Sequence, residues 1–247
     1  MPARGTSFLA VDVGGSSVKS GLVVDGRVEN VAREPVAPDL DGLVAQLERV
    51  VDGRDWGLCI PGLIENGTVR YAANLPLRET PLPELLEPRP RVFVNDLVAA
   101  TVGEADGGTL ALLQIGTGIA ARCAIDGQVL PGGEVGHLRF RDDGPPCRCG
   151  NHGCVEAYLR EADGPTDGAL EAIGFAAAAL VAAWDPGTLR LGGGVAAAWG
   201  KTLIEAVRAG LSERLLPSLA DSTRVEPARF GDSAALLGLA ALARSPE

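Results

Sequence analysis

The stretch FLAVDVGGSSVKSGLVV (Phe8–Val24) contains two apolar runs that flank a glycine turn. Both runs are rich in β-branched and other apolar residues, which is typical of strands. A third run of this kind, Arg27–Val36, follows Asp25-Gly26, a dipeptide that favours two-residue hairpin turns. We therefore predict three successive strands, at 8–13, 18–24 and 27–36.

The same order of strands and turns is repeated in the second half of the chain. In the first half, a helix is expected over Leu40–Val51, strands over Trp56–Ile60 and Val92–Asn95, and a helix over Asp96–Glu104. In the second half, strands are expected over Thr109–Ile115, Ala120–Ile125, Gln128–Leu130 and Leu189–Leu191, and helices over Gly168–Trp184, Trp199–Leu215 and Ser233–Ala243. This pattern predicts an α/β fold of two domains, 1–104 and 105–232, with a ligand cleft between them. The last helix, within 233–247, is a candidate to complete the first domain.

Composition and charge restrict the class of protein. The 247 residues are 46% hydrophobic, which suits a globular chain with a sizeable core. The formal net charge of -10 disfavours nucleic-acid partners, which need clustered Lys and Arg. The apolar stretch Ile173–Trp184 is shorter than the roughly 20 residues of a membrane span, and Met1–Ser7 lacks the pattern of a signal peptide. We predict a cytoplasmic protein without a membrane segment.

Glycine turns occur at three strand ends, and each is a candidate phosphate site. The first comprises Asp12, Gly14, Gly15 and Ser16; the second Gly116, Thr117 and Gly118; the third Gly192, Gly193 and Gly194. Glycine lets the backbone approach an anion, and consecutive N–H groups can form an anion-binding nest. Asp12 ends its strand and can hold a magnesium ion through water. Each turn taken alone is equally compatible with a plain hairpin or a connection between elements.

Three of the five cysteines lie close together in the sequence, at Cys147, Cys149 and Cys154. With one histidine they supply the Cys3His set of a closed structural zinc site. His137, ten residues upstream of the first of them, is favoured as the fourth ligand, but His152 inside the loop can compete with it. The other two cysteines lie singly in apolar runs and are expected in the core.

Asn95 and Asp96 stand where a strand ends and a helix begins. Both residue types are preferred helix caps, so a structural role is one interpretation. In a phosphotransferase, the aspartate at such a position can instead accept a proton from an attacking hydroxyl. The sequence leaves both interpretations open.

Taken in order, these motifs resemble those of the ROK family of sugar kinases and repressors, which includes bacterial glucokinases. The motifs are DVGGSS (12–17), ND (95–96), IGTG (115–118), GGEVGH (132–137), CRCGNHGCVE (147–156) and LGGG (191–194). The resemblance covers nearly the whole chain, and its most specific part is the block of cysteines with the glutamate and histidine before it. It implies an actin-like, ribonuclease-H-like ATPase fold of two α/β domains with an interdomain cleft, in agreement with the repeated pattern.

The resemblance also implies roles for individual residues. Asp96 resembles the catalytic base of the family. The residues that resemble the family's sugar ligands are Asn74, Asn95, Asp96, Glu134, His137 and Glu156. The residues that resemble the family's zinc ligands are His137, Cys147, Cys149 and Cys154. The first two glycine turns resemble the phosphate motifs, and Gly192–Gly194 resemble the adenosine motif.

We therefore predict an ATP-dependent kinase that transfers the γ-phosphoryl group to a hydroxymethyl oxygen of a hexose or hexose-like substrate, with Mg²⁺ and structural Zn²⁺. The alternatives are a non-catalytic sugar-binding protein, a kinase of a cyclitol or amino sugar, and a kinase that uses polyphosphate. Only Met1–Thr6 precede the first strand, which predicts a short form without the DNA-binding domain of family repressors. Homodimers are common in the family, but no feature of this sequence decides between monomer and dimer.

The segment Ala157–Arg190 is much shorter than its counterpart in the family. The missing residues would normally build helices beside the nucleotide. We therefore expect the base of the phosphoryl donor to be recognised poorly.

Overall fold

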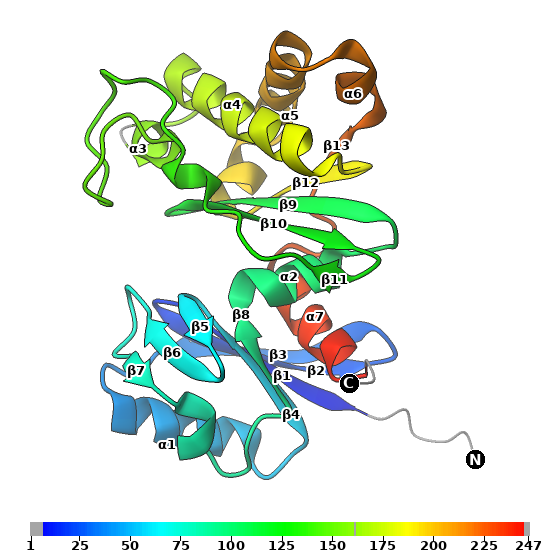
Figure 1. The fold of residues 1–247 in the computed structure, drawn as a ribbon. Helices are drawn as coiled ribbons and strands as arrows, with labels where there is room; N and C mark the ends of the chain where they lie inside the picture. Colours follow the sequence, from blue (N-terminus) through cyan, green and yellow to red (C-terminus); the bar gives the residue numbers. More distant parts are fainter. Residues whose placement is uncertain (1–6, 161, 245–247) are drawn as a thin grey trace. The chain divides into compact units, whose positions relative to one another are not determined.

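The computed structural model describes residues 7–160 and 162–244. The chain divides into two compact units (Figure 1). Unit 1 contains the residues up to Gly103 and those from Asp232 onward, and unit 2 contains Glu104–Gly231. Each unit has its own five-stranded sheet.

The sheet of unit 1 has the strand order β3-β2-β1-β4-β8. Its strands are β1 (Phe8–Val13), β2 (Ser17–Val24), β3 (Arg27–Pro35), β4 (Trp56–Ile60) and β8 (Val92–Asn95). The predicted hairpins β1-β2 and β2-β3 are confirmed and are antiparallel. In contrast, β1, β4 and β8 run parallel, so that their carboxyl ends meet at one edge of the sheet.

Alternate residues of β1 enter two different cores of unit 1, because successive side chains of a strand point to opposite faces. Leu9 and Val11 pack with the buried side chains of α1 (Leu40–Val51). Phe8 and Ala10 pack with α2 (Asp96–Glu104) and α7 (Ala234–Leu242). The expected helices at 40–51 and 96–104 are therefore confirmed, and each covers its own face of the sheet. A short 3-10 turn, η3 (Gly231–Ser233), precedes α7.

Unit 1 also contains a small antiparallel sheet that the sequence did not predict. It consists of β5 (Leu63–Glu65), β6 (Thr68–Tyr71) and β7 (Arg78–Thr80), and the 3-10 turn η1 (Leu82–Leu85) follows it. Most residues of these strands are exposed or half-buried, and each strand has only three or four residues. Such short runs carry too little alternation of apolar and polar residues to be identified.

The sheet of unit 2 has the order β11-β10-β9-β12-β13. Its strands are β9 (Thr109–Ile115), β10 (Ile119–Ile125), β11 (Gln128–Val129), β12 (Thr188–Gly192) and β13 (Arg224–Pro227). Its helices are α3 (Val155–Arg160), α4 (Asp167–Trp184), α5 (Gly194–Arg214) and α6 (Pro217–Ser222), with a 3-10 turn η2 (Val135–His137). The strands expected in this half are confirmed within one residue at every end, whereas β13, α3 and α6 were not predicted.

The helix α4 is long and apolar enough to span a membrane by length and composition. Half of it is buried, and residues such as Ile173 and Val181 pack in the core of unit 2 with β9 and α5. The stretch 173–184 is thus a core helix, as the sequence predicted.

One helix boundary was predicted wrongly. The expected helix at 199–215 begins earlier, at Gly194, and ends at Arg214. Gly200 has non-helical dihedral angles (φ 50°, ψ -120°) and interrupts α5 near the residue where the prediction began. The glycines at 192–194 concealed the first turn of α5 in the sequence, because glycine disfavours helix interiors.

A buried ion pair lies where the chain enters and leaves unit 2. Arg190 and Glu104 are almost completely buried and lie 3.3 Å apart from Nη1 to Oε2. Arg190 also contacts Asp106 at 2.7 Å. The Glu104 carboxylate accepts hydrogen bonds from the backbone N–H groups of Arg229 and Phe230. The first and last residues of the unit are thus held by one group of charges.

Candidate active site

The parallel strands of unit 1 bring two predicted site segments to one edge of its sheet. In the strand register, Asp12 pairs with Cys59, and Ile60 pairs with Asn95. Asp12 and the Asn95-Asp96 pair therefore lie at the carboxyl ends of their strands, where open α/β sheets commonly bind ligands.

The start of α2 fixes Asn95 and Asp96. The Asn95 Oδ1 accepts hydrogen bonds from the N–H groups of Leu97 (2.9 Å) and Val98 (3.3 Å), and its Nδ2 donates to the Gly62 carbonyl (3.0 Å). The Asp96 Oδ1 accepts from the Leu97 N–H at 2.8 Å. The structural interpretation of Asn95 as a helix cap is thus confirmed, and the cap also fixes the backbone that carries Asp96.

Asp12 lies in a partly buried polar cluster, and the sequence did not predict its contacts. Its Oδ2 is 2.8 Å from the Lys19 Nζ, and its Oδ1 is 3.5 Å from the Cys59 Sγ. Lys19 is buried and also donates to the Asp232 carbonyl at 2.5 Å. Burial, and then the negative charges of Asp12 and Asp96, raise the pKa of the Cys59 thiol well above its usual value, so the thiol stays protonated and can donate to Asp12.

The pairing with Lys19 bears on the magnesium role predicted for Asp12. The Lys19 ammonium group compensates the charge of the Asp12 carboxylate. Each carboxylate oxygen can accept more than one hydrogen bond, so Asp12 still fits a water-mediated metal contact. Lys19 stands directly opposite Asp12 in the β1-β2 hairpin, and this register was the signal that would have revealed the pair.

The first glycine turn is tight and lies against Asn74. The Gly14 N–H donates to the Ser17 carbonyl at 2.8 Å, so this N–H is used within the hairpin. A Cβ on Gly15 would lie only 2.8 Å from the Asn74 Cβ. Glycine is required here by close approach, and the predicted phosphate turn and a predicted sugar ligand are neighbours in unit 1.

In unit 2 the four predicted zinc ligands lie together. The ligand atoms of His137, Cys147, Cys149 and Cys154 are all within 4.8 Å of one another. The Cys149 and Cys154 sulfurs are 3.7 Å apart, and the Cys147 Sγ is 3.7 Å from the His137 Nδ1. A tetrahedral zinc with bonds of about 2.3 Å to sulfur separates its sulfur ligands by about 3.8 Å. The residues fit the metal, and His137 belongs to the cluster instead of the competing His152.

The thiols of the cluster differ in their environment. Burial raises the pKa of the Cys154 thiol to about 12. A hydrogen bond from the Asn151 backbone lowers the pKa of the exposed Cys149 thiol to about 7. A divalent cation would stabilise all of the thiolates together. Cys59 and Cys123, predicted to be core residues, are buried and lie outside this cluster.

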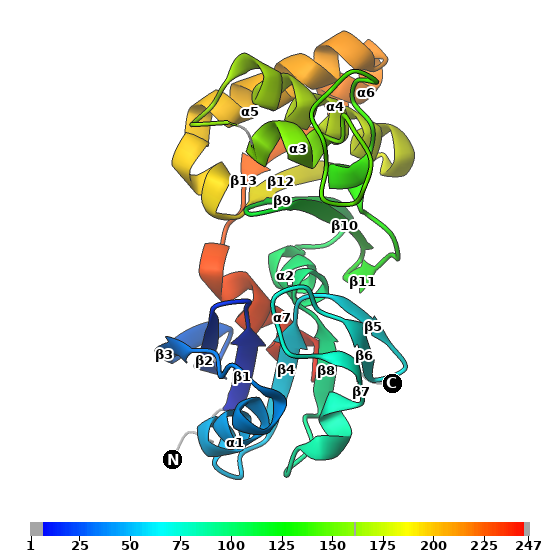
Figure 2. The same ribbon diagram turned by 90° about the vertical axis from the view of Figure 1, so that its left-hand side faces the viewer.

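Glu156 lies on the first turn of α3, two residues after the last cysteine (Figure 2 shows α3 beside α4). Its Oε2 accepts from the Ile119 N–H at 3.3 Å, and a Cβ on Gly118 would lie 2.8 Å from that oxygen. Its Oε1 is 3.3 Å from Arg160. Glu156 is therefore held against the second glycine turn, which is itself closed by a hydrogen bond from the Gly116 N–H to the Gly118 carbonyl.

The other predicted residues of unit 2 lie near the same strands. Gly136, in η2 between Glu134 and His137, packs so closely on β10 that a Cβ would lie 2.2 Å from the Ile119 carbonyl oxygen. Gly193 has a positive φ of 92°, caps α5, and lies against the carbonyl of Ile115 at the end of β9. The second and third glycine turns are thus adjacent, at the ends of paired strands.

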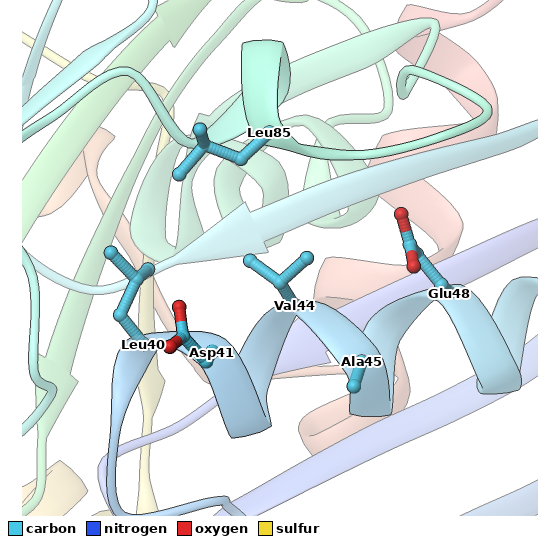
Figure 3. Close-up of a pocket in the computed structure, with 6 residues that line it drawn as sticks. All are labelled: Leu40, Asp41, Val44, Ala45, Glu48 and Leu85. Carbon is cyan, nitrogen blue, oxygen red and sulfur yellow. The ribbon is translucent and has the colours of Figure 1, made fainter.

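Surface pockets occur in both units. One of about 320 Å³ lies between α1 and η1 (Figure 3), and it contains none of the predicted site residues. It is lined by Leu40, Asp41, Val44, Ala45, Glu48 and Leu85. A second, of about 390 Å³, is mainly apolar and includes Glu134 together with residues of α4.

Comparison with known proteins identifies the family. The sequence matches the ROK family over residues 8–163 and 160–245. The chain belongs to the ROK family. Its glucokinase relative from Halalkalibacterium halodurans is 27% identical, over 94% of this chain and 93% of that protein. The alignment spans 308 positions, more than the 247 residues of this ROK protein, so the relative carries segments that are absent here.

Solved structures agree with this assignment. A ROK hexokinase from Thermus thermophilus is 28% identical, with a TM-score of 0.79 over 95% of this chain and 97% of that one. A ROK transcriptional regulator, a homologue of the Escherichia coli MLC protein, has a TM-score of 0.82 at 22% identity, and covers 97% of this chain and 78% of its own. The ROK protein therefore has the actin-like ATPase fold, as its sequence predicted. The family includes both kinases and regulators.

Proposed function

We propose that this ROK protein is a sugar kinase that transfers the γ-phosphoryl group of ATP to a hydroxymethyl oxygen of a hexose or hexose-like substrate. The observation that carries the proposal is the edge of the unit 1 sheet, where Asp12 and the first glycine turn lie at the end of β1 and Asp96 lies at the end of β8, with only β4 between these two strands. The resemblance to a glucokinase and a hexokinase supports the same reaction.

In the proposed reaction, Asp96 accepts the proton of the sugar hydroxymethyl group as its oxygen attacks the γ-phosphorus. The bond from phosphorus to the bridging oxygen breaks, and ADP leaves with that oxygen. Phosphoryl transfer depends mainly on positioning and on neutralising charge. Asn95 holds Asp96 in place through the helix cap and contributes to binding sugar hydroxyls.

The phosphates are proposed to lie on the first two glycine turns, and the adenosine on Gly192–Gly194. Asp12 would hold a magnesium ion through water, and Mg²⁺ neutralises charge on the phosphoryl oxygens when bound. Lys19 is already in contact with Asp12 and supplies a second positive charge at this position.

The sugar is proposed to contact Asn74 and Asn95 in unit 1, and Glu134, His137 and Glu156 in unit 2. A structural zinc held by His137, Cys147, Cys149 and Cys154 would keep the loop that carries these last residues in one conformation. His137 faces the thiols with Nδ1, which leaves Nε2 for the sugar.

The experiment is a coupled assay of ADP release over a panel of hexoses, N-acylated amino sugars and cyclitols. We expect ADP release that requires a sugar from this panel. Calorimetry with the same panel measures sugar binding and so distinguishes the alternative. A sugar that binds but is not phosphorylated with ATP, GTP or polyphosphate as donor would identify a non-catalytic sugar-binding protein and reject the kinase.

The zinc role has its own test. Native protein is expected to contain about one zinc per chain, and chelation should weaken sugar binding before the chain unfolds. Less than about half a zinc per chain in freshly purified protein would contradict this role.

A further inference from the structure

Arg160, the last residue of α3, contacts both the zinc cluster and a proposed sugar ligand. Its Nη2 lies 3.3 Å from the Glu156 Oε1 and 3.8 Å from the Cys147 Sγ. Only 26% of its side chain is exposed. The spacing of Glu156 and Arg160, four residues apart with the acid first, is the favourable order for an ion pair on a helix.

Charge explains why a cation is placed here. Three thiolates, a neutral imidazole and Zn²⁺ together carry one negative charge, and the Glu156 carboxylate carries another. Without a cation between them, these two negative groups would repel one another in a partly buried region, where screening by water is weak. Arg160 compensates both at once.

The opposite side of Glu156 is also fixed. Its Oε2 accepts from the Ile119 N–H at 3.3 Å and lies where a Cβ on Gly118 would collide with it. Arg160 supplies the contact to the other oxygen, so the carboxylate is held between the second glycine turn and the zinc loop. The Nε of Arg160 is buried without a hydrogen-bond partner within the described residues, whereas Nη2 makes the polar contacts to Glu156 and Cys147.

We infer that Arg160 is a positioning residue that couples the zinc loop to the orientation of Glu156. This inference rests on the proposed role of Glu156 as a sugar ligand. It predicts that loss of Arg160 and loss of zinc weaken sugar binding by the same route, through the freedom of one carboxylate. It also predicts that Arg160 retards release of zinc by stabilising the Cys147 thiolate.

The experiment compares Arg160→Met, Arg160→Lys and a control, Arg148→Met, in zinc-loaded protein. Arg148 is an exposed arginine between two cysteines of the loop, so its replacement removes the same charge nearby. Sugar affinity is measured by calorimetry, and zinc release by the rate of transfer to a coloured chelator. Thermal melting of each variant verifies that it is folded.

We expect Arg160→Met to raise the sugar Kd about tenfold and to accelerate zinc release, whereas Arg148→Met changes both by less than about twofold. Arg160→Lys should restore zinc retention more than sugar affinity, because lysine keeps the charge but lacks the planar guanidinium. In a Glu156→Gln background, Arg160→Met should change the sugar Kd by less than about twofold, because the shared route is already broken.

An unchanged sugar Kd in Arg160→Met would overturn the inference. It would also be overturned if Arg160→Met raised the sugar Kd by the same factor in the Glu156→Gln background as in the wild type. If the wild-type protein binds no sugar of the panel, the proposed function fails instead. The zinc-release rates then decide about Arg160 alone: equal rates for wild type and Arg160→Met would overturn its coupling to the zinc loop.

Discussion

Two glycines of one turn differ in what surrounds them. A Cβ on Gly118 would lie 2.8 Å from the Glu156 Oε2, whereas a Cβ on Gly116 would meet nothing within 4 Å. Gly118→Ala should therefore displace Glu156 and raise the sugar Kd about tenfold, the effect of one lost modest contact. Gly116→Ala is the matched control and should leave sugar affinity nearly unchanged. Equal affinities of the two variants would show that Glu156 is not held by this turn or does not bind the sugar.

At the residue scale, the sequence predicted which residues gather but not all of their contacts. Motif spacing was sufficient to propose the cysteine cluster and to favour His137 over His152, and the position of η2 brings His137 into that cluster. The contact of Lys19 with Asp12 and the contacts of Arg160 were not predicted, since a lysine in a strand and an arginine in a helix are ordinary in a sequence. Only the hairpin register and the helical spacing distinguish them.

At the scale of elements, α4 and α5 pack closely through glycines. A Cβ on Gly210 would lie 2.7 Å from the Gly174 Cα, a distance that forces the two backbones apart. Gly210→Ala should lower the free energy of unfolding by about 1–3 kcal/mol, even though alanine favours a helix. Gly174→Ala meets its nearest atoms at 3.3 Å and should cost less. Urea unfolding of both variants checks which one loses more stability. A Gly210→Ala variant at least as stable as Gly174→Ala would show that the backbones of α4 and α5 are not in close contact at Gly210.

The charges around Arg190 connect three parts of unit 2. These are the residues before β9, the strand β12 and the segment after β13. The hydrogen bond from Arg190 lowers the pKa of Asp106. A carboxyl whose pKa is lowered by folding stabilises the folded state above its unfolded pKa, and this contribution is lost as the pH falls. Asp106→Asn should thus destabilise the protein near neutral pH by less than about 1 kcal/mol, because Asp106 is half-exposed.

The difference between Asp106→Asn and wild type should begin to shrink as the pH falls below about 4, the ordinary pKa of an aspartate, and should disappear only below the lowered pKa of Asp106 in the folded protein. Urea midpoints measured from pH 7 downward test this, with the exposed Asp143→Asn as control. A difference that stays constant over this range would exclude the carboxylate charge as its origin.

The elements that sequence reasoning found are those with long apolar patterns. The strands 8–13 and 109–115 and the helix 40–51 contribute a whole face to a core, so their periodicity is strong. The sheet β5-β6-β7 and the start of α5 were missed for physical reasons, since short exposed strands and glycine-rich helix starts have no such periodicity. Tertiary contacts hold the chain next to this sheet: the carbonyl of Gly62, the residue before β5, accepts a hydrogen bond from the Asn95 Nδ2.

For the whole molecule, the length of the chain bears on the phosphoryl donor. Between Cys154 and β12 the described residues form α3 and α4, and α4 is a core helix. Glycine turns bind phosphates without recognising a base. We therefore predict that GTP replaces ATP within about tenfold in kcat/KM. Competition kinetics test this, and a preference for ATP above about a hundredfold would require a formed base pocket.

The central claim is that the protein transfers phosphate to a sugar with Asp96 as the base. The most direct measurement is phosphorus NMR of the product formed from ATP and the best-bound sugar, with wild type and Asp96→Asn compared at equal zinc content. We predict a sugar phosphate from the wild type and turnover reduced at least ~100-fold in Asp96→Asn, with sugar affinity largely kept. Phosphate released to water instead of sugar, or more than about a tenth of wild-type turnover in Asp96→Asn, would contradict the account.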